Sequence, residues 1–157
     1  MLTFLLIALG LQHIIHEFSH VLAAKLLGEK VIKIQWLTYK GGTRVFYENE
    51  PDLTDEVEKK WAVIAGAGYI ITNSLGYIFA IVFTLFDNSF IKVFLCIVSM
   101  VFLVIDSLYF TLGSTFDFGD VIGVRRVLNI SKTLAIISSS LILVINIFII
   151  GVVFYNI

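Results

Sequence analysis

The sequence predicts an all-α membrane protein with four transmembrane helices and a small β-hairpin between the first two. Hydrophobic residues make up 59% of its 157 residues and charged residues only 15%, against roughly 25% charged in a typical soluble domain. The apolar residues form four segments, each near the 20 or so residues that a helix needs to cross a bilayer. So little polar surface excludes a soluble globule, and one cysteine excludes a disulfide scaffold.

The first expected helix covers residues 1–27, and a group of polar side chains interrupts its apolar run between Gln12 and His20. Its opening resembles the apolar core of a signal peptide. However, no Lys or Arg precedes Lys25, so the basic region that starts such peptides is missing. Cleavage would also remove every histidine of the chain. We therefore expect this segment to be a retained transmembrane helix.

A polar connection, residues 28–60, follows the first helix. Residues 31–36 and 43–47 are rich in strand-forming side chains and flank the sequence Lys40-Gly41-Gly42. Two such runs around a glycine turn are typical of a β-hairpin. The acidic stretch at residues 51–60 is expected to be an amphipathic lead-in to the second helix.

The remaining expected spans are residues 61–86, 93–116 and 133–157. The second and fourth spans contain no charged residue, and the third contains only Asp106. Backbone that crosses a bilayer must satisfy its hydrogen bonds internally, so these segments are expected to be helices. Residues 1–157 are accordingly interpreted as a single integral-membrane domain in contact with the lipid bilayer.

The basic residues predict the orientation of the chain in the membrane. Seven of the eleven Lys and Arg lie around the first connection and three follow the third helix, whereas only Lys92 lies near the second connection. The positive-inside rule then places the first and third connections in the cytoplasm and both termini outside, in a multi-pass protein of the cell membrane. A net charge of −1 gives no argument for a nucleic-acid partner.

All three histidines, His13, His16 and His20, lie in the first helix, and His16-Glu17-Phe18-Ser19-His20 has the pattern His-Glu-x-x-His. Positions i and i+4 share one helix face, so both imidazoles can bind one metal ion, and Glu17 beside them can act as general base. Such a catalytic site suits Zn²⁺ with three protein ligands and a water. Incidental polar residues are the alternative, but each ionisable group in a membrane is costly, at about 2.5–3.5 kcal/mol for a central Asp.

The predicted topology narrows the search for a third ligand to the cytoplasmic end of the third helix, where Asp117 and Asp120 occur. Asp117 follows the apolar run directly, so we expect it to reach the histidines, with Asp120 as the fallback. A solvated loop that merely carries acids is the alternative. Because His20 lies deeper than Asp117, we expect the chain around Gly113 to re-enter the membrane, or the first helix to end shallower. Either arrangement needs a water-accessible cavity, expected to open to the cytoplasm.

These motifs resemble the site-2 protease (M50) family of intramembrane zinc metalloproteases. Residues 16–28 resemble its His-Glu-x-x-His helix, residues 117–122 its Leu-Asp-Gly element, and residues 65–76 the small-residue part of its middle core helix. The resemblance implies hydrolysis of peptide bonds in or near transmembrane segments of membrane-protein substrates. It implies Zn²⁺ held by His16, His20 and Asp117, Glu17 as general base and then acid, and Asn73 as a substrate contact. An edge of the predicted hairpin would add a substrate strand; a hairpin that only covers the membrane surface is the alternative.

Two other functions remain open from the sequence. A metal-binding or ion-transporting membrane protein would line a path with its intramembrane histidines and acids, and a catalytically silent relative would only bind. Glu17 favours the protease, since a transport path does not require an acid beside the first ligand. His13 is interpreted as an outer group of the site or as a packing residue. Asp106 is interpreted as a functional acid or as one that is hydrogen-bonded to a neighbouring helix.

Overall fold

The computed structural model describes residues 1–36, 43–48 and 58–155. The chain is mostly helical with one two-stranded sheet, as the sequence predicts. Its elements in order are α1 (Leu2–Leu26), β1 (Val31–Gln35), β2 (Arg44–Tyr47), α2 (Lys60–Phe83), α3 (Ser89–Met100), the π-helix η1 (Val101–Ile105), α4 (Asp106–Phe116), α5 (Asp120–Val127) and α6 (Lys132–Tyr155).

The described residues contain four helices long and apolar enough to span a membrane, which confirms the predicted fold class. They are α1, α2, the continuous helix from Ser89 to Phe116, and α6. The third begins four residues earlier than expected, because the Asn88 side chain accepts hydrogen bonds from the backbone N–H groups of Phe90 and Ile91 and so caps the helix.

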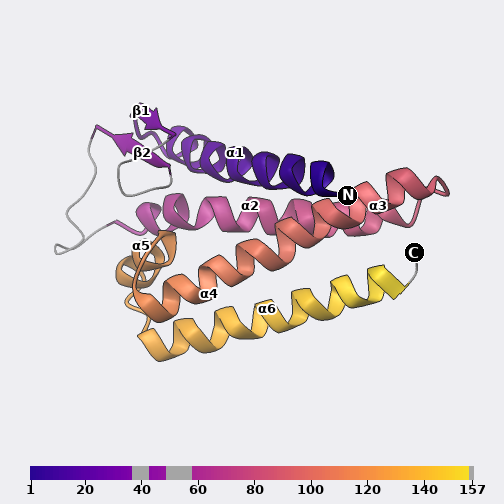
Figure 1. The fold of residues 1–157 in the computed structure, drawn as a ribbon. Helices are drawn as coiled ribbons and strands as arrows, with labels where there is room; N and C mark the ends of the chain where they lie inside the picture. The colour runs from indigo at the N-terminus through magenta and orange to yellow at the C-terminus, as the bar shows by residue number, and fades with distance from the viewer. Residues whose placement is uncertain (37–42, 49–57, 156–157) are drawn as a thin grey trace.

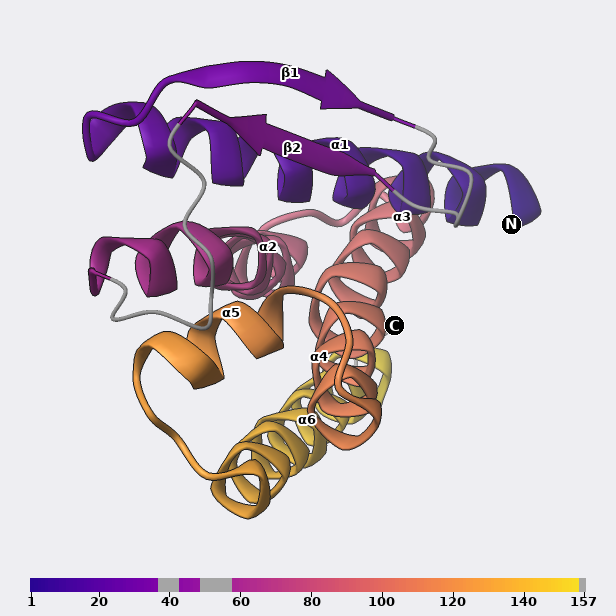
Figure 2. The same ribbon diagram turned by 90° about the vertical axis from the view of Figure 1, so that its left-hand side faces the viewer.

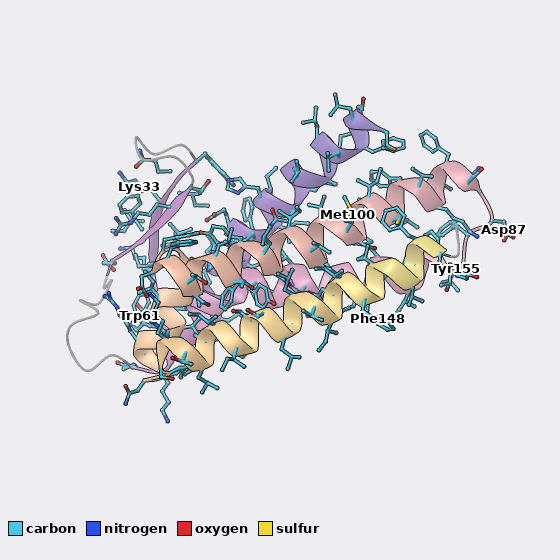
Figure 3. The ribbon with its side chains drawn as sticks, turned by 60° about the horizontal axis from the view of Figure 1, so that its bottom comes forward. Lys33, Trp61, Asp87, Met100, Phe148 and Tyr155 are labelled. Carbon is cyan, nitrogen blue, oxygen red and sulfur yellow. The ribbon has the colours of Figure 1, made fainter. Side chains whose placement is uncertain are left out.

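The four long helices extend from one end of the molecule to the other, with both termini at one end and the hairpin and α5 at the other (Figure 1), and α1 crosses the other helices at an angle (Figure 2). Helix α2 is central and packs against α1, α3 and α5, while α6 packs against α4. The outer face of α6 is apolar and exposed; Phe148, 71% exposed, projects away from the bundle (Figure 3). Such a face suits contact with lipid chains rather than water.

The hairpin lies over the outer side of α1 (Figure 2). Its strands are antiparallel, with Val31 opposite Tyr47 and Gln35 opposite Arg44. The Trp36 ring centroid lies 6.0 Å from that of Phe18, on α1. The expected glycine turn at Lys40–Gly42 and most of the expected acidic lead-in lie outside the described residues.

A π-helix interrupts the third span immediately before Asp106. Its Leu103 carbonyl accepts a hydrogen bond of 3.0 Å from Nδ2 of Asn146, on α6. Asn146 is fully buried, and it also contacts Asn73 of α2 at 2.8 Å and Ser107 of α4 at 2.6 Å. This polar group therefore joins three helices around the π-helix.

The chain reverses direction after α4 rather than around Gly113. Gly113 stays within α4, so the chain does not unwind at Gly113 itself, and re-entry of the following turn into the membrane stays a prediction. Asp117 has a φ of 56° and Gly119 a φ of 69°, and these left-handed residues turn the chain into α5. Gly113 permits the tight turn, because a Cβ there would lie 2.7 Å from the Phe118 carbonyl oxygen. Helix α5 then crosses the end of the bundle next to α2 (Figure 2).

Candidate metal centre

Helix α1 turns two imidazoles toward the interior of the bundle. His16 and His20 are one helical turn apart, are 6% and 5% exposed, and have ring centroids 5.0 Å apart. Helix α1 is otherwise one of the more exposed helices, since only 17% of its most apolar 18-residue stretch is buried inside the bundle. The histidine face is thus the part of α1 that the bundle encloses.

Small residues of α2 provide the space for these rings. A Cβ added to Gly68 would lie 2.5 Å from His16 Nε2, which is too close for any real contact. One turn earlier, Ala65 packs against α5, where a Cβ on Gly123 would lie 2.9 Å from the Ala65 Cβ. The small-residue segment of α2 therefore lets α1 and α5 approach closely enough to share a site.

Asp120 brings a carboxylate from α5 to both histidines. Its Oδ2 lies 2.9 Å from His16 Nε2 and 3.3 Å from His20 Nε2. One ligand atom from each of these three residues lies within 4.8 Å of the others. Partial burial raises the pKa of the Asp120 carboxyl, but its contacts with His16 and His20 outweigh this and hold that pKa below its ordinary value.

Asp117, the expected third ligand, lies elsewhere. Its Oδ1 accepts a hydrogen bond of 2.6 Å from Arg125 Nη2, and its Oδ2 accepts one of 2.7 Å from Lys132 Nζ. These cations hold the pKa of the Asp117 carboxyl below its ordinary value, with the Lys132 hydrogen bond as the largest cause. The geometry thus corrects the choice between the two acids: Asp120 joins the histidines, and Asp117 links the end of α4 to α5 and α6. The left-handed turn at Asp117 and Gly119 makes the Asp117 and Asp120 side chains point in different directions.

A cavity of about 790 Å³ opens beside the three residues, between α1, α2, α4, α5 and β2. Glu17 lines it together with His16, His20 and Asp120. Glu17 is partly buried, and its carboxylate forms no hydrogen bond or ion pair with the other described residues. An acid adjacent to two imidazoles, facing a cavity, is placed to accept a proton from a water molecule there.

The donor set fits a zinc ion. His20 Nδ1 must carry a proton, because it donates a hydrogen bond of 2.7 Å to the Ile64 carbonyl, which can only accept. When this ring is neutral, its Nε2 lone pair is free to bind a metal ion, and that nitrogen faces Asp120. Two imidazole nitrogens and one carboxylate oxygen are the kind of set that catalytic zinc sites use, with a fourth position left for water.

Two further residues singled out from the sequence have other surroundings. Asn73 is buried, does not line the cavity, and its Oδ1 accepts from Asn146 Nδ2. This geometry favours the interhelical contact over a direct role in substrate binding. His13 lines the cavity, but its Nε2 lies 2.7 Å from Thr43 Oγ1, so it also helps to fix the hairpin on α1.

Sequence reasoning missed several residues around the histidines. Gln12 and Thr72 contact Asp106 behind His16, and Tyr109 lies edge-on to the His16 ring with centroids 6.5 Å apart. Gln12 lies one turn before His16, and Thr72 one turn after Gly68, so helical spacing alone carried a signal for both. Tyr109 lies on a different helix, and no local pattern in the sequence points to it.

A comparison with protein-family models finds a match to the family described as Peptidase M50B-like, over residues 3–155. This match covers nearly the whole chain and all four long helices. Searches among curated proteins and among solved structures found no significant match.

Proposed function

The chain belongs to the M50B-like peptidase family, the site-2 protease family, and on this premise we propose that it is an intramembrane zinc metalloprotease. Its substrates are membrane proteins, cut in or near their transmembrane segments. The observation that carries the proposal is the grouping of His16, His20 and Asp120 beside Glu17 in one cavity among four apolar helices.

His16, His20 and Asp120 would hold the ion, with Asp120 in the place that the sequence favoured for Asp117. When bound, Zn²⁺ would supply Lewis-acid chemistry that makes water a nucleophile at neutral pH. Glu17 accepts the proton of the attacking water and later delivers it to the amine that leaves the cleaved peptide bond. The carbonyl of Ile64 keeps His20 in the tautomer that presents Nε2 to the cavity.

The hairpin supports binding of the substrate in an extended form. Thr43, Arg44 and Val45 of the β2 segment line the cavity, and β2 pairs with β1 along one side in a sheet of two strands. A substrate segment that unwinds can add to the other edge through backbone hydrogen bonds. A transmembrane helix must unwind to expose its peptide bonds, so this edge would present the substrate backbone next to the metal centre.

Glu17→Gln tests the reaction. The purified variant is expected to keep bound zinc, since Glu17 is not a ligand, and to lose peptide-bond cleavage by about 10²–10⁴-fold, the contribution typical of a general acid–base. Zinc content is measured by elemental analysis, and cleavage is followed with a detergent-solubilised peptide that contains a transmembrane segment. Ser99→Ala, a change at a buried residue of α3 outside the cavity, is the control and should cleave like the wild type.

The same experiment separates the other functions. If Glu17→Gln keeps both zinc and full cleavage activity, the proposed role of Glu17 is wrong. If the wild type binds zinc, cuts no membrane substrate, and moves zinc across proteoliposomes, the protein is a transporter. Zinc binding with neither activity identifies a silent relative of the proteases.

A further inference from the structure

Asp106 is the one acid of the described residues that lies in the interior of a long apolar helix and outside the proposed zinc ligands and general base. It is 2% exposed, directly after the π-helix of the third span. A buried carboxylate in a membrane is costly unless other groups compensate for it. Neighbouring groups must therefore stabilise the Asp106 carboxylate.

Three side chains surround the Asp106 carboxylate. Gln12 Nε2 donates a hydrogen bond of 3.0 Å to Oδ1, and the Thr72 hydroxyl donates to Oδ2. Of the ion pairs between described residues, only the one with His16 reaches Asp106, with 3.3 Å from His16 Nδ1 to Oδ1. The hydrogen bonds to Gln12 and Thr72 fix the carboxylate in one orientation, with an oxygen beside the imidazole.

The two nitrogens of His16 face two different acids. Nε2 faces Asp120 in the cluster, whereas Nδ1 is buried, has no hydrogen bond with good geometry, and lies next to Asp106. His20 shows the same division, since its Nε2 faces Asp120 and its Nδ1 faces an acceptor on α2. A neutral imidazole that binds a metal through Nε2 carries its proton on Nδ1, so each ring needs an acceptor behind it.

We propose that Asp106 is a positioning residue, which accepts the Nδ1 proton of His16 and so aims Nε2 of that ring at the metal. This inference rests on the proposed function, since it assigns a second layer to the same zinc site. Asp106 lines the cavity but is not one of the three clustered ligand residues, so in this proposal it acts through His16. A carboxylate behind a histidine ligand typically strengthens metal binding 10–100-fold.

The π-helix explains how α4 can deliver this acid. Each residue of an α-helix advances the side-chain direction by about 100°, so the extra residue in a π-helical turn changes the direction of every residue that follows. If one residue were removed from Val101–Ile105 and α3 kept its packing, the Asp106 side chain would be rotated about 100° away from α1. π-Helical segments occur frequently at functional sites, and this one ends at the residue that faces His16.

Zinc affinity of purified protein, measured by competition with a chromogenic chelator, tests the proposal. Asp106→Leu removes both acceptor oxygens with the same number of side-chain heavy atoms and is expected to weaken zinc binding about 10–100-fold. Asp106→Asn keeps one acceptor oxygen and should weaken zinc binding less. The visible absorption spectrum of the Co²⁺-loaded protein should change in both variants, because it reports the geometry of the ligands. Ser99→Ala, which also alters a fully buried polar group of the same span, should leave affinity and spectrum unchanged.

A purely structural Asp106 would give a different result. Thermal unfolding of the metal-free variants would then change while zinc affinity and the Co²⁺ spectrum stayed those of the wild type, and this overturns the proposal. If Asp106→Leu does not fold, Asp106→Asn decides by the same two measurements. A wild type that binds no zinc would overturn the proposed function itself, which distinguishes that failure from a failure of the role of Asp106.

Discussion

Asp117 and Asp120 lie three residues apart, but they face different groups. Asp117 is paired with Arg125 and Lys132 at the surface, while Asp120 faces two imidazoles. Asp120→Ala is therefore expected to weaken zinc binding by more than the roughly 100-fold typical of an outer-layer change, because it removes a ligand. Asp117→Ala, the matched control, should bind zinc like the wild type. If a chelator competition assay shows weaker zinc binding for Asp117→Ala and wild-type binding for Asp120→Ala, Asp117 is the third ligand.

The proximity of the His16 and His20 imidazoles could be predicted from the sequence, because both residues belong to one helix and its spacing is regular. The choice between the two acids could not, because it depends on a turn. A positive φ at Asp117 and at Gly119 directs two nearby side chains to different partners. Asp117 is not glycine, so its left-handed conformation leaves no mark in the sequence.

Asn146 gives α6 a measurable role in holding the third span. Its Nδ2 donates to the Leu103 carbonyl, and its Oδ1 accepts from the Tyr77 hydroxyl at 2.6 Å. Asn146→Leu leaves these partners without their hydrogen bonds and should lower the free energy of unfolding by about 1–3 kcal/mol. Unfolding in mixed detergent micelles measures this change. Ser138→Ala is the control on α6, since the Ser138 hydroxyl donates to the Leu134 carbonyl of its own helix at 2.8 Å; an equal loss in both variants would contradict a specific role for Asn146.

Hydropathy predicted the long helices because each is a continuous apolar run. It could not predict α5, which is eight residues long and contains Arg125 and Arg126. Nor could it predict the π-helix, since Val101–Ile105 is as apolar as the helices on either side. Helix α5 packs against α2 and α4, and the π-helix packs against α2 and α6; a local pattern does not record such contacts.

The placement of the whole molecule in the membrane remains a prediction from its basic residues. The hairpin strands and α5, which carry Lys33, Arg44, Arg125 and Arg126, lie at one end of the bundle, and the termini lie at the other (Figure 1). In a Cys96→Ala background, we expect a cysteine at Tyr155 or Asp87 to react with a membrane-impermeant maleimide in intact cells, and a cysteine at Lys33 to react only after lysis. Labelling of Lys33→Cys alone in intact cells would reverse the orientation and place the metal centre on the outer side.

The contact between His16 and Asp120 joins residues 104 positions apart in the chain. During biosynthesis, α1 enters the membrane long before the ribosome has made Asp120, so the nascent chain carries its histidines and Glu17 without a complete metal-binding set. The proposed protease therefore has no activity while it is being inserted. Under the proposed function, the complete set of zinc ligands forms only after Asp120 on α5 has been synthesised and folded into place.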